Sequence, residues 1–360
     1  MDKLGEIREK VAANERLTFD ELLYLSKDVE LLELAKLSAV VRERFNGKNV
    51  YYNHNFHIEP TNICVYNCKF CSFKKLATSK DAWCMTESEV IDYAEAHFDE
   101  KTTEIHLVGG VNPRQTLYDY VSVIKKLREK FPKVGIKAFS AIEHIYMIEK
   151  ANLSYDEGVK LLVEAGMDSI TGGGAEIFAK RVREKICNDK PDSKKWLSLH
   201  EAAHKQGVKT NATMLYGHIE TLEERIDHIL QIRDLQDKYN GFNSFIPLKY
   251  RSFGNSLGSI GECSLVEDLK TVAISRLALD NVPHIKAYYP MYGKQRTEMA
   301  LNFGADDLDG TPIESTKIYS MAGVSDNSIT VEEIDDLIKK AGYIPVERDT
   351  FYNRVVLVSP

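Results

Sequence analysis

The sequence predicts an α/β fold: a parallel (β/α)8 barrel of the TIM type, with a helical segment before it and a small extension after it. Two observations predict this class. From Phe56 onward, short extended segments alternate with amphipathic helical stretches. Eight such segments lie between residues 56 and 310, which is the number that a closed parallel barrel needs. A doubly wound open sheet would usually have fewer strands and a glycine-rich nucleotide-binding turn.

The composition is that of a globular chain with a large core, because 43% of its 360 residues are hydrophobic and 28% are charged. The formal net charge is −7 and no run of five basic residues occurs, so we expect no nucleic acid partner. Even the most apolar window, residues 31–41, contains Glu33 and Lys36, and no membrane span is therefore expected. The opening MDKLGEIREK does not resemble an export signal, which predicts a cytoplasmic protein.

Residues 1–50 are predicted to form helices that lead into the barrel. Thr18 and Glu21 have the spacing of a capping box, in which each side chain accepts a hydrogen bond from the other residue's backbone N–H. Leucines then recur with helical spacing between Leu22 and Val40.

The barrel itself is predicted at residues 51–310, and residues 311–360 are expected to form an extension packed on it. Each of the first seven strands precedes a candidate helix, and several of these helices begin with a capping box. The strands are predicted at 56–61, 104–110, 136–140, 168–173, 209–215, 244–250, 284–290 and 305–310. The later capping boxes pair Thr86 with Glu89, Ser154 with Glu157, Thr221 with Glu224 and Thr330 with Glu333.

Three cysteines, Cys64, Cys68 and Cys71, follow the first strand in the spacing C-x3-C-x2-C. Thiolates this close together indicate a shared metal centre. A four-iron cluster fits best, because one loop can supply three of its ligands and leave the fourth iron open to a substrate. The alternative is a zinc site completed by His54 or His57, although zinc usually takes two separated ligand pairs and the chain has no second pair.

The other cysteines, Cys84, Cys187 and Cys263, are scattered along the chain, so a disulfide framework is not expected. We predict that they are small buried hydrophobic residues.

At the cysteine loop the sequence resembles the radical S-adenosylmethionine (SAM) superfamily, whose signature is this spacing with an aromatic residue, here Phe70, before the third cysteine. The resemblance implies a [4Fe-4S] cluster whose open iron chelates SAM. An electron from the reduced cluster then cleaves SAM to methionine and a 5'-deoxyadenosyl radical. The implied electron donor is a protein such as flavodoxin or ferredoxin.

Further stretches are similar to one branch of this superfamily, the aminofutalosine (aminodeoxyfutalosine) synthases of menaquinone biosynthesis. The stretches are EPTNICVYNCKFCSF, HLVGGVNP, IKAFSAIE, GGGAEIF, TNATMLYGH, IPLKY, ADDLDGT and IPVERDTFYN. GGGAEIF and IPVERDTFYN resemble the synthases more than the related dehypoxanthine futalosine cyclases. The cyclase remains the alternative within this class, and a non-catalytic iron–sulfur or zinc protein is the alternative outside it.

The resemblance implies a transferase in which the deoxyadenosyl radical adds to the enol ether of 3-[(1-carboxyvinyl)oxy]benzoate, an aromatic dicarboxylate. The adduct radical rearranges by attack on the aromatic ring, and carbon dioxide and an electron are lost. The product is 6-amino-6-deoxyfutalosine, and SAM is consumed as a co-substrate.

Residues at the predicted strand ends are the candidates for SAM binding. Alone, the glycine pair at 109–110 would be a strand-ending turn, and Glu176 would start the next helix. The resemblance assigns them instead to the cosubstrate. The SAM candidates are Phe70, Gly109, Gly110, Ser140, Glu143, Gly173 and Glu176, with Gly172 and Gly174 beside them.

The two carboxylates of the aryl substrate need cationic or hydrogen-bonding partners inside the barrel. Each candidate taken singly fits a surface or packing role as well. The candidates, which follow the fifth to seventh strands, are Thr213, Tyr216, His218, Lys249, Arg251 and Tyr288, with Tyr289 beside the last.

Two sets of polar residues are given structural roles. Asp306, Asp307 and Asp309 could bind a cation. Because their segment also matches relatives with other substrates, we expect a shared structural or cosubstrate role. The histidines within predicted helices or strands are expected to be packing residues. They are His97, His106, His200, His204 and His228.

Overall fold

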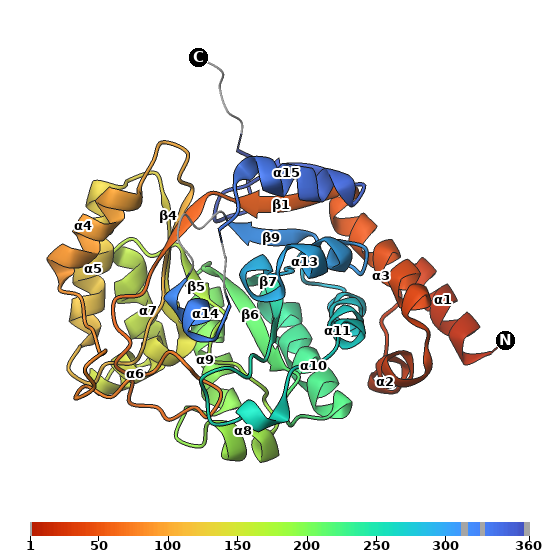
Figure 1. Ribbon diagram of the computed structural model, residues 1–360, viewed down its shortest axis with the longest axis horizontal. Helices are drawn as coiled ribbons and strands as arrows, with labels where there is room; N and C mark the ends of the chain where they lie inside the picture. The colour runs from red at the N-terminus through yellow and green to blue at the C-terminus, as the bar shows by residue number, and fades with distance from the viewer. Residues whose placement is uncertain (1, 311–315, 325–327, 356–360) are drawn as a thin grey trace.

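The computed structural model describes residues 2–310, 316–324 and 328–355. It opens with three helices, α1 (Lys3–Ala13), α2 (Phe19–Asp28) and α3 (Leu31–Asn46). These helices lie at one side of the molecule, where α3 packs along α11 (Leu265–Ala278) (Figure 1). The predicted helical lead-in is therefore present, and Thr18 and Glu21 form its capping box.

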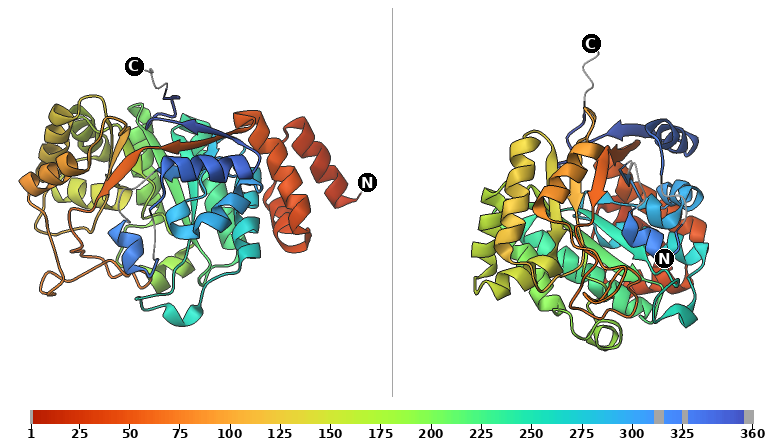
Figure 2. Two further views of the ribbon diagram at one scale, coloured as in Figure 1. Left: turned by 45° about the horizontal axis from the view of Figure 1, so that its top comes forward. Right: turned by 60° about the vertical axis from the view of Figure 1, so that its left-hand side comes forward.

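The centre of the molecule is a curled sheet of seven parallel strands that follow one another in chain order, β2 to β8. The strands are β2 (Asn55–Ile58), β3 (Glu104–Leu107), β4 (Gly135–Ser140), β5 (Ser169–Thr171), β6 (Lys209–Tyr216), β7 (Phe242–Lys249) and β8 (His284–Ile285). Helices cover the outside of this sheet (Figure 2). The predicted α/β architecture of the barrel type is thus confirmed.

The covering helices begin where the sequence patterns place them, and the four later capping boxes are all formed. In order they are α4 (Glu87–His97), α5 (Leu117–Lys130), α6 (Ala141–Lys150), α7 (Tyr155–Glu164), α8 (Lys180–Ile186), α9 (Ser193–Lys205), α10 (Leu222–Tyr239), α11, α12 (Tyr289–Tyr292), α13 (Lys294–Leu301), α14 (Lys317–Met321) and α15 (Val331–Lys340). Within the described part of the chain, no helix is long and apolar enough to cross a membrane.

The predicted eighth strand takes a different place from the one expected. Its residues form β9 (Asp307–Gly310), which pairs with β1 (Asn49–Asn53) in a second sheet completed by β10 (Ile344–Glu347). An isolated parallel bridge between Lys286 and Asp307 connects β9 to the end of β8. The eight expected strands therefore do not close on each other, because β1 and β10, which the sequence pattern missed, take the free edges of β9 and β1 (Figure 1).

The segment after β10 closes the amino ends of the strands. Arg348 is fully buried and its Nε donates to Asp307 at 2.7 Å. Thr350 Oγ1 donates to Glu104 at the start of β3, at 2.9 Å. The ring of Tyr352 stacks on His284 at the start of β8, with 3.8 Å between centroids. The end of the chain thus forms a floor beneath the curled sheet.

Candidate functional site

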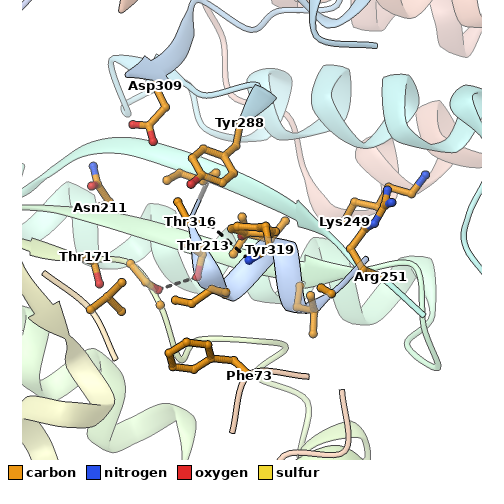
Figure 3. A pocket seen from close by; sticks show the side chains of 18 of the residues that line it. Phe73, Thr171, Asn211, Thr213, Lys249, Arg251, Tyr288, Asp309, Thr316 and Tyr319 are labelled. Carbon is orange, nitrogen blue, oxygen red and sulfur yellow. Dashed lines mark hydrogen bonds between the residues drawn. The ribbon is translucent and has the colours of Figure 1, made fainter. Parts of the chain in front are cut away.

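A pocket opens at the carboxyl ends of the strands, where parallel α/β sheets carry their functional residues. The cysteine loop contributes Phe70, Cys71, Ser72 and Phe73 to its mouth. Inward-facing side chains of β2 to β9 form its walls, and α14 covers one side. In Figure 3 the side chains of Asn211, Thr213, Tyr288, Asp309 and Tyr319 surround the same space.

The cysteine loop is held against the barrel by backbone hydrogen bonds. Gly110 N donates to Thr61 O at 2.7 Å, and Val65 N donates to Val111 O at 3.0 Å. Lys69 N donates to Ile186 O at the end of α8, at 2.8 Å. The loop that carries the three cysteines is therefore anchored on two sides of the pocket mouth.

Three free thiols on one anchored loop suit a cluster with three protein ligands. None of Cys64, Cys68 and Cys71 is in a disulfide. Among the described residues, no three His, Cys, Asp or Glu side chains are gathered closely enough to hold a single metal ion. Burial raises the pKa of the Cys68 thiol, so metal binding would have to displace its proton.

Neither histidine of the zinc alternative is placed to complete such a site. His54 precedes β2 at the amino end of the sheet, where its Nε2 lies 3.0 Å from Asp99 Oδ2. His57 lies in β2 and faces the interior of the pocket. The cysteines follow that strand at its other end, so the donor set favours the cluster.

Glu176 lies at the pocket mouth beside the cysteine loop and forms an ion pair with Lys190. The Lys190 ammonium lies 5.6 Å from the centre of the Phe70 ring. Burial alone would lower the pKa of Lys190, but the neighbouring Glu176 carboxylate raises it. Glu176 has a left-handed backbone conformation (φ 50°) and does not start a helix, since α8 begins at Lys180.

Gly109 and Gly110 pack directly beneath the cysteine loop. A side chain at Gly109 would place its Cβ 2.8 Å from Thr61 O, and one at Gly110 would overlap the Ile63 carbonyl. Small residues are therefore required here by the docking of the loop, in addition to any contact with a cosubstrate. These two glycines line a second pocket, separate from the one that contains Phe70 and Glu176.

Ser140 and Glu143 form the capping box of α6. One carboxylate oxygen of Glu143 accepts from Gly109 N at 3.0 Å, and the other accepts from Ser140 N and Oγ at 2.7 and 2.6 Å. Burial raises the pKa of Glu143 to about 7. The pair fixes the end of β3 relative to α6, and through Gly109 it supports the cysteine loop.

The glycines after β5 divide into two groups. Gly172 and Gly173 line the main pocket, and Thr213 Oγ1 donates to Gly172 O at 2.6 Å. Gly174 has φ 92° and packs on Ile142, away from that pocket. Gly172 also abuts the β6 backbone closely, since an added Cβ would lie 2.8 Å from the carbonyl carbon of Ala212.

The structure does not bring Tyr216 and His218 into the pocket. Thr213 and Leu215 face it, so strand alternation turns Tyr216 outward, where its hydroxyl bonds Asp268 and Tyr292 at 2.8 Å each. His218 lies beyond the strand, and its Nε2 is 3.0 Å from Leu215 O. Alternate residues of a strand face opposite sides, so counting along the strand from Thr213 would have shown that Tyr216 faces away from the pocket.

Lys249 and Arg251 line the pocket with their stems and direct their charges elsewhere (Figure 3). Lys249 Nζ lies 3.2 Å from Asp268 Oδ2, and Arg251 Nη1 lies 3.2 Å from Glu262 Oε2. Tyr288 does face the pocket, with its ring 5.2 Å from that of Tyr319. Tyr289, the next residue, lies in α12.

The inner end of the pocket is polar, and the sequence reasoning missed most of it. Each of these side chains points inward from its strand. They lie closer to the amino ends of the strands than the residues at the pocket mouth do. They are His57, His106, Lys137, Asn211, Lys286 and Asp309. Counting inward positions back from the strand ends would have found them.

The clustered aspartates bind basic side chains and backbone N–H groups. Asp307 binds Arg348, Asp309 binds Lys286 at 2.5 Å, and Asp306 accepts from Ile285 N at 2.8 Å. This geometry supports the expected structural role for Asp306 and Asp307, whereas Asp309 also lines the pocket.

Four of the five histidines pack as expected. His97 stacks on Tyr93 in α4, His200 and His204 lie beside Thr210, and His228 lies beside Phe178. His106 differs because it faces the pocket. Of the scattered cysteines only Cys187 is buried; Cys84 is exposed and Cys263 half-buried, so the prediction of three buried residues was wrong for these two.

Known proteins resemble the chain over nearly its whole length. Residues 58–232 match the radical SAM superfamily, and residues 239–359 match the CofH/MqnC C-terminal region. An aminodeoxyfutalosine synthase of Thermus thermophilus is 41% identical over 98% of this chain and 96% of its own. One of Streptomyces coelicolor is 39% identical over 96% and 92%.

A solved structure of methylornithine synthase has a TM-score of 0.75, covering 94% of this chain and 96% of that one. At 16% identity this likeness concerns the fold alone.

Proposed function

Because the chain belongs to the aminodeoxyfutalosine synthase family of the radical SAM superfamily, we propose that it joins the adenosyl group of SAM to 3-[(1-carboxyvinyl)oxy]benzoate. The products are 6-amino-6-deoxyfutalosine, carbon dioxide and methionine. The full-length similarity to two curated synthases carries this proposal. The polar pocket at the carboxyl ends of the strands supports it, because a dicarboxylate needs such partners.

The cofactors are a [4Fe-4S] cluster held by Cys64, Cys68 and Cys71, and SAM. When bound and reduced by a donor such as flavodoxin or ferredoxin, the cluster supplies the electron that breaks SAM. The loop that carries the three thiols is anchored by its backbone, and Cys71 lines the mouth of the pocket. Phe70, Gly172, Gly173 and Glu176 line the same pocket and would hold SAM.

The remaining SAM candidates act from behind the pocket. Gly109 and Gly110 allow the cysteine loop to lie against β3, and Ser140 and Glu143 hold Gly109 in place. Their contribution to SAM binding is to position the loop. The pocket walls exclude water from the aryl substrate, which protects a radical from side reactions.

A product-mass experiment tests the proposal. Anaerobically reconstituted protein is incubated with dithionite, SAM and 3-[(1-carboxyvinyl)oxy]benzoate. We expect about four irons per chain and a product whose mass includes the adenosyl group. Free 5'-deoxyadenosine as the sole nucleoside product, together with turnover of dehypoxanthine futalosine, would identify the cyclase. Colourless protein containing zinc would identify a non-catalytic protein.

A further inference from the structure

The inner end of the pocket is built from buried ionisable side chains. Lys137, Lys286 and Asp309 are 2%, 1% and 4% exposed, and all three line the pocket. His57 is 8% exposed and His106 stacks on it, with 4.4 Å between ring centroids. The interior of a parallel barrel is usually filled by branched aliphatic side chains, so this layer departs from the common pattern.

Most of the charges in this layer are already paired. Lys137 Nζ lies 2.7 Å from Glu104 Oε2, and Lys286 Nζ lies 2.5 Å from Asp309 Oδ1 and 3.7 Å from Asp307 Oδ1. Asp307 in turn binds Arg348. Three carboxylates therefore face three cations, and the layer is electrically balanced.

Among the described residues the layer is left incomplete at the histidine pair and at Glu104, whose Oε1 is buried without a hydrogen-bond partner. His57 Nε2 and His106 Nδ1 are buried and have no hydrogen-bond partner among the described residues. A buried polar atom without a partner is destabilising, so such an atom on a residue that lines a pocket points to a water or a ligand that satisfies it.

We propose that this inner end is a carboxylate subsite, in which His57 donates a hydrogen bond to the ring carboxylate of the aryl substrate beside Lys137 and Lys286. The assignment rests on the proposed function, because that function supplies the substrate. The subsite adds two points to that function: which end of the substrate enters the pocket first, and which residues recognise that end.

The orientation follows from the two ends of the pocket. The cysteine loop and Glu176 lie at the mouth, so the carbon that receives the adenosyl group has to lie there as well. The enol ether therefore points outward and the ring carboxylate points inward. Between them, Ile246, Leu248 and Tyr288 provide apolar surface for the aromatic ring.

Binding of the substrate carboxylate is coupled to uptake of a proton by His57. Burial lowers the pKa of His57; Asp309 and Glu104 raise it, and Lys137 and Lys286 lower it further. His106, the stacked neighbour, also has its pKa lowered by burial and is neutral. A carboxylate beside His57 favours the imidazolium form, so binding takes up a proton and weakens as pH rises.

A comparison of two ligands on matched variants tests the subsite. Calorimetry of the unreduced, SAM-loaded holoenzyme measures binding of the substrate and of the same enol ether without its ring carboxylate. We expect the wild type to prefer the dicarboxylate roughly tenfold or more. In His57→Phe, which keeps a ring to stack on His106, the preference should fall to within about threefold. His204→Phe, a buried histidine outside the pocket, should keep it.

Repeating the titration in buffers of different ionisation enthalpy measures proton uptake by the wild type and by His57→Gln. Uptake with the dicarboxylate, absent from His57→Gln, supports the subsite. A preference that His57→Phe retains, or binding without proton uptake, would overturn it. Equal binding of both ligands by a wild type that still forms the adenosylated product overturns the subsite alone. A wild type that binds neither ligand and forms no such product overturns the proposed function too.

Discussion

The two ends of the curled sheet differ in structure: the carboxyl end is open and the amino end is closed. At the carboxyl ends, the cysteine loop is anchored by its backbone while its thiols and the pocket residues remain partly exposed. At the amino ends, the segment after β10 buries Arg348 and Thr350 in contacts with Asp307 and Glu104. The comparison teaches that one end is arranged to receive a group and the other to hold the strands together.

The strongest test removes a ligand at the open end. We expect Cys68→Ala to abolish cluster assembly and product formation, because two thiolates cannot hold the cluster. The matched control is Cys187→Ala, a buried cysteine outside the loop, which should keep its iron. Iron content and product mass are the measurements, and equal iron loss in both variants would contradict the ligand assignment.

The closed end should respond in stability. Arg348→Met leaves the buried Asp307 without its strongest partner, and breaking a buried pair in this way costs about 3–5 kcal/mol. The free energy of unfolding is measured by denaturant titration. Arg8→Ala breaks an exposed pair with Glu33 and should cost less than about 1 kcal/mol. Similar losses in the two variants would mean that the floor does not hold the strands.

The support beneath the cysteine loop should depend on pH. The folded-state pKa of Glu143 is raised by burial to about 7, above the ordinary glutamate value of 4.5. Its contribution to stability is therefore fully present below about pH 4.5 and is lost as pH rises through 7. In Glu143→Gln this slope should be absent, so the stability difference between wild type and variant shifts by up to about 3 kcal/mol in favour of the variant. A pH-independent difference would refute the raised pKa.

The smallest effect is expected on the outer side of the pocket wall. Tyr216→Phe loses hydrogen bonds to Asp268 and Tyr292, which costs about 1 kcal/mol of stability. Because Tyr216 faces away from the pocket, KM for the aryl substrate should stay within about twofold. A large rise in KM would contradict this placement and indicate that Tyr216 contacts the substrate.

Local patterns in the sequence predicted the helices and most strands, because capping boxes and hydrophobic periodicity are short-range features. The place of β9 was not predictable in this way. It depends on pairing with β1, and Tyr51 and Asp307 are far apart in the chain yet adjacent in the sheet. Short strands without a clear alternation give no local signal for such pairing.

The sequence predicted candidate residues at the mouth of the pocket but not those at its inner end. The cysteines and Phe70 form a contiguous motif, and Glu176 follows a strand end, so both are visible in sequence. His57, Lys137 and Lys286 lie inside strands, where a polar residue reads as a packing or surface position. Only the curvature of the sheet brings them to one place.

The floor has a consequence for how the protein is made. Glu104 and Asp307 are synthesised well before Thr350 and Arg348, which bind them. Lys137 and Lys286 are the cations available to these carboxylates earlier in the chain, and Arg348 and Thr350 add the remaining contacts afterwards. A chain that stops short of Arg348 would lack the residues that close the amino ends of the strands.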